Sequence, residues 1–148
     1  MDQATADNLF EELLLEMAQQ RACADLLALI VQRLAQRPDV ALARIWLVGD
    51  GDICEVCPMA SDCNDRERCL HLQASAGKPR NADEDWSRID GAFRRFPLGV
   101  RKVGHIAATG EAVEVRCVQE DPAWIARPEW AQREGIHGFG GQPLVYRG

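Results

Sequence analysis

Residues 103–115 read VGHIAATGEAVEV, and this stretch decides the fold that we expect for the chain. We expect a short helix around Val103–Thr109. Gly104 permits a tight start to that helix, and Gly110 permits the positive φ with which many helices end. The valine-rich residues 112–118 then predict a strand. A short helix, a turn and a strand therefore follow one another without a long loop.

Two helical segments precede this stretch in the sequence. Apolar residues recur at helical spacing over 7–37, and we expect a break between the two segments near Arg21–Asp25. Pro38 ends the second segment, because the residue before a proline is disfavoured in the α region. The apolar stripe of the first segment packs either on the domain's own sheet or on the same helix of a second subunit. We expect the latter, a homodimer formed through residues 1–37.

The remaining elements complete an α+β pattern. The expected strands and helices are VALARIWLVG at 40–49, LHLQASAG at 70–77, a short segment SRIDGAFRRF before Pro97, a helix near 128–134, and GFGGQPLVYRG as a glycine-rich approach to a last strand. This order predicts one domain over 1–148 with an antiparallel sheet and helices on one face.

Composition and charge exclude several classes of function. The chain has 148 residues, of which 47% are hydrophobic and 27% are charged, with a formal net charge of −6. A nucleic-acid-binding surface needs clustered Lys and Arg, so we expect no direct nucleic-acid partner. The start lacks the basic region of a signal peptide, and the longest apolar run, LLALIV at 26–31, is too short to span a bilayer. We therefore expect a cytoplasmic protein without a membrane partner, in which thiols stay reduced.

These elements resemble a GAF domain, a GAF/PAS-like fold, of the kind found at the N-terminus of bacterial transcription activators and signalling proteins. The resemblance covers roughly residues 20 to 148. The segments that carry it are LLALIVQRLAQ, ARIWLVG, LHLQASAG, FPLGVRKVGHIAATGEAVEV with DPAW after it, and EWAQREGIHGFGGQPLVYRG. Its most specific piece is VGHIAATGEAVEV.

The resemblance implies a regulatory module without catalytic activity. Such modules bind a small molecule or a cofactor in a pocket between the sheet and the small helices, often as dimers, and pass the signal to an attached output domain. Fold alone does not name the small-molecule ligand. The pocket residues that the resemblance implies are Arg101, His105, Thr109, Trp124, Trp130 and His137.

The C-terminal segment departs from the GAF pattern. PLVYRG is normally followed by a turn and a further apolar strand, and this chain stops at Gly148 inside that turn. Either the chain is a fragment, or the sheet lacks its last strand and exposes a hydrogen-bonding edge. In both cases the output domain is absent from the chain.

A cysteine-rich loop at 53–70 separates the first two strands. A subset of GAF modules is similar in inserting Cys-x-x-Cys-Pro-Met and Cys-Leu-His-Leu at this place. The four cysteines, close enough in sequence to converge on one ion, are Cys54, Cys57, Cys63 and Cys69. Zinc is one expected cofactor, and an iron–sulfur cluster is the other, since Pro58 stands beside a cysteine as in many cluster sites. His71 is a possible substitute for one thiol, although its position in a strand allows it to point away.

Metal binding is one interpretation of the loop cysteines. The alternative is that they are reduced thiols, which pair as Cys54–Cys57 or Cys63–Cys69 disulfides on exposure to air. Cys23 and Cys117 are most simply core residues. Some small free-standing GAF proteins reduce methionine sulfoxide with cysteines, and Cys57, Cys63, Cys69 or Cys117 could act in that way. For the function of the whole chain, a protein–protein interaction scaffold is a third possibility beside the sensory domain and the sulfoxide reductase.

Overall fold

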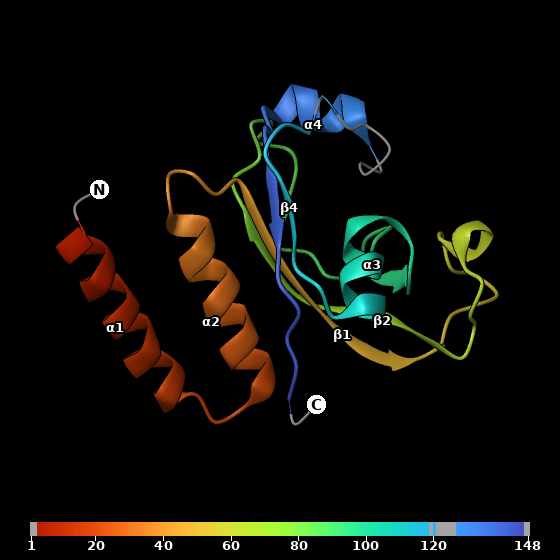
Figure 1. The fold of residues 1–148 in the computed structure, drawn as a ribbon, viewed down its shortest axis with the longest axis horizontal. Helices are drawn as coiled ribbons and strands as arrows, with labels where there is room; N and C mark the ends of the chain where they lie inside the picture. Colours follow the sequence, from red (N-terminus) through yellow and green to blue (C-terminus); the bar gives the residue numbers. More distant parts are fainter. Residues whose placement is uncertain (1–2, 119, 121–126, 147–148) are drawn as a thin grey trace. The chain divides into compact units, whose positions relative to one another are not determined.

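The computed structural model of the chain describes residues 3–118, 120 and 127–146 (Figure 1). Its elements are α1 (Gln3–Gln19), α2 (Cys23–Gln36), β1 (Leu42–Asp50), a 3-10 turn η1 (Ala60–Asp62), β2 (Arg68–Gly77), β3 (Arg95–Pro97), α3 (Arg101–Thr109), β4 (Val113–Val115), α4 (Pro128–Glu134) and β5 (Phe139–Gly141). The chain divides into two compact units, which are Met1–Ile45 with Gln73–Ile89, and Trp46–Leu72 with Asp90–Gly148.

The first unit holds the two N-terminal helices, which run antiparallel and side by side (Figure 1). The break between them lies where the sequence predicts it. Leu27, Val31 and Ala35 are buried along one face of α2. Arg33 on α2 donates to the Glu16 carboxylate on α1, with Nε 2.8 Å from Oε2. The two helices are therefore joined by a charged contact as well as by packing.

The apolar stripe of α1 is largely exposed within this chain. Phe10 is 61% exposed and Leu14 is 47% exposed. These two side chains lie on one face of α1, because residues four apart in a helix are neighbours. The homodimer that the sequence predicts stays a prediction, and this face is where it would form.

The core of the second unit lies on one face of strands β2 and β3. Met59, Leu70 and Phe96 are buried together, with Trp46 and Phe93 packed against them. The ring centroids of Trp46 and Phe96 lie 6.5 Å apart in an edge-to-face arrangement, a geometry that aromatic pairs favour.

Strands β2 and β3 pair antiparallel in a register that sets the opposite face of the sheet. Leu70 pairs with Phe96, and His71 pairs with Arg95. Because successive residues of a strand point to opposite faces, Cys69, His71 and Arg95 share the face away from this core. The packing of Leu70 and Phe96 therefore places three polar or sulfur-bearing side chains together on the other side.

Helix α3 forms where VGHIAATGEAVEV predicts a helix. It ends at Gly110, whose φ is 71°. A Cβ built on Gly104 would lie 2.3 Å from the Pro97 carbonyl oxygen, so the helix approaches β3 more closely than any residue with a side chain allows. The prediction for Gly110 is confirmed, whereas Gly104 is the fourth residue of α3 and does not start the helix.

Replacement of Gly104 by alanine tests this close approach. Alanine is a better helix former than glycine by about 1 kcal/mol, so a stabilised protein would be the result if only propensity mattered. We expect instead a loss of about 1–3 kcal/mol in the free energy of unfolding, because overpacking against backbone cannot relax cheaply. Denaturant titration measures the change. Gly91→Ala is the control, since a Cβ there meets nothing within 4 Å.

The C-terminal strand differs from the sequence prediction. The predicted strand in QPLVYR is absent from the described residues, and Leu144 and Tyr146 are 67% and 81% exposed. Strand β5 instead forms in the glycine-rich stretch and pairs antiparallel with β4. The reason is close packing: a Cβ on Gly141 would lie 2.4 Å from Ile106 Cδ1, so only a small residue fits beside α3.

The other boundaries are shorter than the sequence suggests. Strand β4 covers three residues of the expected 112–118, and only Arg95–Pro97 of the SRIDGAFRRF segment is a strand. The strands form two sheets in the described part of the chain, β1-β2-β3 and β4-β5, rather than one. The α+β class is confirmed, with antiparallel pairing of β2–β3 and of β4–β5. Among the described residues, no helix has the length and apolar character needed to cross a membrane.

Candidate metal centre

The cysteine-rich loop connects β1 to β2 and is closed at its base by backbone contacts. The Gly51 N–H donates to the Glu67 carbonyl over 2.8 Å. A Cβ on Gly51 would lie 2.0 Å from the Arg66 carbonyl oxygen, so the two ends of the loop meet at a spacing that glycine alone permits. The loop is therefore anchored at both ends, and its cysteines are held near the end of the sheet.

The four cysteines of the loop line one small cavity. Cys54, Cys57, Cys63 and Cys69 all contribute to its wall, and the cavity has a volume of ≈ 20 Å³. That space fits about one water-sized body. All six cysteines lie in the described part of the chain, and no disulfide bond joins any two of them. The four cysteines thus border one cavity, but no three of their sulfurs lie within 4.8 Å of one another. Their role as ligands of one metal ion stays a prediction.

Two of the sulfurs are engaged with backbone carbonyls. Cys54 Sγ lies 3.3 Å from the Arg66 carbonyl oxygen, and Cys63 Sγ lies 2.8 Å from that of Asp65. A carbonyl oxygen only accepts hydrogen bonds, so the two sulfurs donate and are protonated thiols. A metal ion takes thiolates, and binding would therefore replace both hydrogen bonds.

Cys69 differs from the loop cysteines because it lies on β2 and is buried. Burial raises the pKa of its thiol, the nearby Arg95 guanidinium opposes this, and the Asp52 carboxylate with the thiols of Cys54 and Cys57 adds to the rise. A raised pKa keeps the sulfur protonated at neutral pH until a cation replaces the proton. Cys69 is thus a latent ligand rather than a free thiolate.

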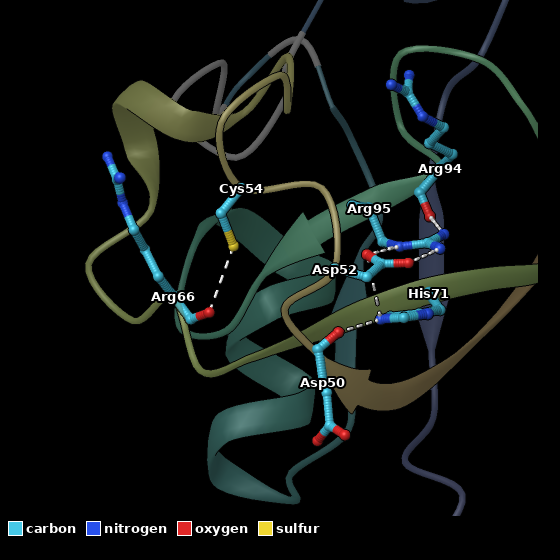
Figure 2. A network of polar contacts seen from close by, with 7 residues as sticks. All are labelled: Asp50, Asp52, Cys54, Arg66, His71, Arg94 and Arg95. Carbon is cyan, nitrogen blue, oxygen red and sulfur yellow. Dashed lines mark hydrogen bonds and ion pairs between the residues drawn. The ribbon is translucent and has the colours of Figure 1, made fainter.

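A second group of possible ligands lies on the same face, where Figure 2 shows Asp52 beside His71 and Arg95. The carboxylate of Asp52, the sulfur of Cys69 and a ring nitrogen of His71 all lie within 4.8 Å of one another. His71 does not point away, since Nε2 lies 2.8 Å from the Asp50 carbonyl oxygen and 4.0 Å from Asp52 Oδ1. Cys69 and His71 are two residues apart in a strand and therefore lie on the same face of the sheet. Their spacing in the sequence already indicates this.

Arg95 holds the Asp52 carboxylate in this cluster. Its Nε and Nη2 donate to the two carboxylate oxygens over 2.8 and 2.6 Å, and these hydrogen bonds lower the pKa of Asp52 to about 2. Sequence reasoning missed both residues. They lie far apart in the chain, and only the β2–β3 register brings Arg95 opposite His71.

The residues predicted for a small-molecule pocket are spread over several elements. Arg101 and His105 lie on α3, and Thr109 ends that helix with its hydroxyl donating to the His105 carbonyl over 2.9 Å. His137 is exposed between α4 and β5. Trp124 lies outside the described residues.

Trp130 is the predicted pocket residue that lines a hollow in the described structure. The hollow has a volume of ≈ 390 Å³ and is formed by residues at α4, namely Arg127, Pro128, Glu129, Trp130 and Arg133. Of the other predicted residues that the structure describes, Arg101, His105, Thr109 and His137 do not line it. The pocket set as a whole stays a prediction.

Comparison with known proteins identifies the fold. No protein-family model and no curated protein matches the chain. The crystal structure of the GAF domain from an Acinetobacter phosphoenolpyruvate-protein phosphotransferase is 19% identical, with 99% of this chain and 72% of that chain covered and a TM-score of 0.58. The GAF domain of a phosphoenolpyruvate-protein phosphotransferase from Coxiella burnetii is 18% identical, with 95% and 69% covered and a TM-score of 0.62. The chain therefore has the fold of a GAF domain.

Proposed function

We propose that the chain is a regulatory sensory domain without catalytic activity, and that its cysteine-rich loop is the sensing element. A single zinc ion held by Cys54, Cys57, Cys63 and Cys69 would clip the loop in place. The observation that carries this proposal is the arrangement of the four thiols around one cavity of ≈ 20 Å³. Tetrahedral coordination by four thiolates is a common structural zinc site.

We favour a single zinc ion over an iron–sulfur cluster, because four cysteine thiolates are a common ligand set of structural zinc. Thiolate donors suit both zinc and iron–sulfur clusters, so analysis of metal and sulfide content distinguishes the two.

The loop is coupled to the rest of its unit through the hydrophobic core. Met59 of the loop is buried against Leu70 and Phe96, and Cys57 packs on the same cluster. Val103 and Ala107 of α3 also contact that cluster. Loss of zinc, through oxidation or chelation, would loosen the loop and disturb the packing beneath α3, which is how a local event would become a signal.

The proposal extends to partners and to cellular location. The two similar solved structures are GAF domains from larger proteins, which supports a role as one part of a signalling protein with an output domain elsewhere. The exposed face of α1 supports a homodimer. A small-molecule ligand beside α3 and α4 is part of the same proposal, and reduced thiols fit a cytoplasmic location.

A cysteine-dependent sulfoxide reductase is the less supported function. Such an enzyme needs an accessible thiolate as nucleophile. Cys69 is 9% exposed and the pKa of its thiol is raised by burial, which makes it a weak nucleophile.

The double variant Cys54→Ser/Cys57→Ser tests the proposed zinc clip. After incubation with a competing chelator and gel filtration, we expect the wild type to keep its zinc and the double variant to lose it. The matched control is Cys23→Ser, which removes an exposed thiol on α2 and leaves the loop intact. Equal zinc content and equal melting temperature in the wild type and the double variant would contradict the proposal.

A further inference from the structure

We propose that Asp52, Cys69 and His71 form an open, three-ligand site for a zinc-like divalent metal ion, and that the Arg95 guanidinium is the cation that the metal displaces from Asp52. This site goes beyond the zinc clip, because only Cys69 belongs to both sets of ligands. Its ligands are Cys69 and His71 on β2 and Asp52 at the base of the loop. The zinc clip depends in addition on the three loop thiols, which are Cys54, Cys57 and Cys63.

The spacing of the donor atoms supports the site. The three atoms lie within 4.8 Å of one another. Ligands in a tetrahedral zinc site lie about 3.3–3.8 Å apart, as follows from bond lengths of about 2.0–2.3 Å. His71 Nε2 and Asp52 Oδ1 lie 4.0 Å apart, close to this range. Cys69 and His71 stand two residues apart on one strand, on the same face of the sheet.

The chemistry of the donors fits a borderline soft divalent ion. One thiolate, one imidazole and one carboxylate are ligands that zinc accepts, and three protein ligands leave a fourth position for water or another molecule. The Asp52 side chain is 43% exposed, whereas that of His71 is 18% exposed. The open position therefore faces solvent on the Asp52 side.

The Asp52 carboxylate already binds one cation, the guanidinium of Arg95. This guanidinium makes two hydrogen bonds to the Asp52 carboxylate, at 2.8 and 2.6 Å. Arg95 also lines the cysteine cavity, so it stands between the two sets of ligands. A bound ion would take over the neutralisation of Asp52 and release Arg95 toward the cavity.

Protons must leave for the ion to bind. In the metal-free protein His71 Nε2 faces the Asp50 carbonyl at 2.8 Å, and because a carbonyl only accepts, Nε2 carries the proton. Coordination through Nε2 sends that proton to solvent, and Nδ1 takes one up, which leaves the neutral ring in its other tautomer. The Cys69 thiol also releases its proton, so one proton leaves the protein for each ion bound.

Sharing of Cys69 makes the two sets of ligands alternatives for one ion. In the wild type the four thiolates hold the ion more tightly, because they enclose it on all sides. When the loop thiols are removed, the ion binds at the open site instead. Substitution of those thiols is therefore the way to observe the open site by itself.

Cobalt(II) titration of the triple variant Cys54→Ser/Cys57→Ser/Cys63→Ser tests the inference. Absorption from sulfur-to-cobalt charge transfer grows with the number of bound thiolates. We expect the triple variant to bind about one cobalt per chain with roughly a quarter of the wild-type intensity, as one thiolate in place of four requires. Far-UV circular dichroism shows whether the variant is folded. If it is not, Cys54→Ala/Cys57→Ala/Cys63→Ala, which removes the same three thiols, replaces it.

Further changes in the triple variant locate the ion. His71→Gln removes a ligand, and we expect the cobalt affinity to fall by more than about 100-fold, since loss of an outer partner alone costs about 10–100-fold. Gly49→Ala removes no ligand, but its Cβ would lie 2.9 Å from His71 Nε2 and displace the ring. We expect a loss of about 10–100-fold there. Gly91→Ala, where a Cβ meets nothing within 4 Å, should leave the affinity unchanged.

Arg95→Gln should act in the opposite direction. It removes both the competitor of the ion and a nearby positive charge, so we expect the affinity to rise by about tenfold, the worth of a charge-assisted hydrogen bond. A rise in this variant beside a fall in His71→Gln is a pattern that general unfolding does not produce.

The outcomes separate this inference from the proposed zinc clip. If the triple variant binds no cobalt while the wild type shows the intensity of four thiolates, the open site is wrong and the clip stands. If the triple variant and the wild type bind with the same low intensity, the clip is wrong and the open site stands. An unchanged affinity in the triple variant carrying His71→Gln also overturns the open site.

Discussion

Phe96→Ala should lower the free energy of unfolding by about 3–5 kcal/mol, the usual cost of removing a buried phenylalanine. Phe96 is 4% exposed and lies between Leu70, Met59 and the ring of Trp46. The alanine leaves a cavity and removes an aromatic pair, which is worth about 0.5–1.5 kcal/mol beyond its area. Denaturant titration followed by tryptophan fluorescence measures the loss.

The same substitution should also weaken the metal centre. Phe96 anchors β3 by its packing, and the neighbouring Arg95 points to the opposite face, where it holds Asp52. Phe96→Leu is the matched control, because it fills most of the volume and should cost less than about 1.5 kcal/mol. Equal losses in the two variants would show that packing at this position does not carry the core.

Removal of zinc from the wild type should lower its melting temperature by about 8–16 °C. Zinc at about 1,000 times its dissociation constant stabilises the folded state by about 4 kcal/mol. In a chain of this size each kcal/mol shifts the melting temperature by about 2–4 °C. Calorimetry before and after treatment with a chelator measures the shift, and readdition of zinc should restore it.

The loop variants provide the comparison for this shift. Cys54→Ser/Cys57→Ser should melt near the temperature of the chelated wild type and respond little to added chelator. Cys23→Ser, on α2, should respond as the wild type does. A chelator-treated wild type that melts at its original temperature would mean that the loop needs no ion.

The sequence predicts the fold well where local chemistry decides the structure. The proline after α2 and Gly110 at the end of α3 mark boundaries that depend on their own backbone preferences. Gly104 was expected at the start of a helix, and the structure places it inside α3 against the Pro97 carbonyl. These signals act over a few residues, so no knowledge of the tertiary structure is needed to use them.

The last strand could not be placed in this way. Leu144 to Tyr146 have high strand propensity, yet the strand forms at Phe139–Gly141. Pairing with β4 and close packing beside α3 decide the position, and strand propensity depends strongly on such context. The glycines that weaken a strand in isolation are what allow this one to fit.

The candidate site shows the same division. The spacing of the cysteines indicates that they gather, because all four lie in or beside one loop. The contribution of Asp52 and Arg95 depends instead on the register between β2 and β3, which pairs residues distant in the sequence. His71 was an intermediate case, since strand alternation puts it on the face of Cys69 but does not say what else is there.

Metal and sulfide content, measured with an absorption spectrum on protein purified without oxygen and without chelators, tests the central claim most directly. We expect about one zinc per chain, no labile sulfide and no visible absorption, because one ion in a cavity of ≈ 20 Å³ accounts for the four thiols. Brown protein with iron and sulfide would replace the zinc clip by a cluster. Protein with six free thiols and no metal would contradict the account.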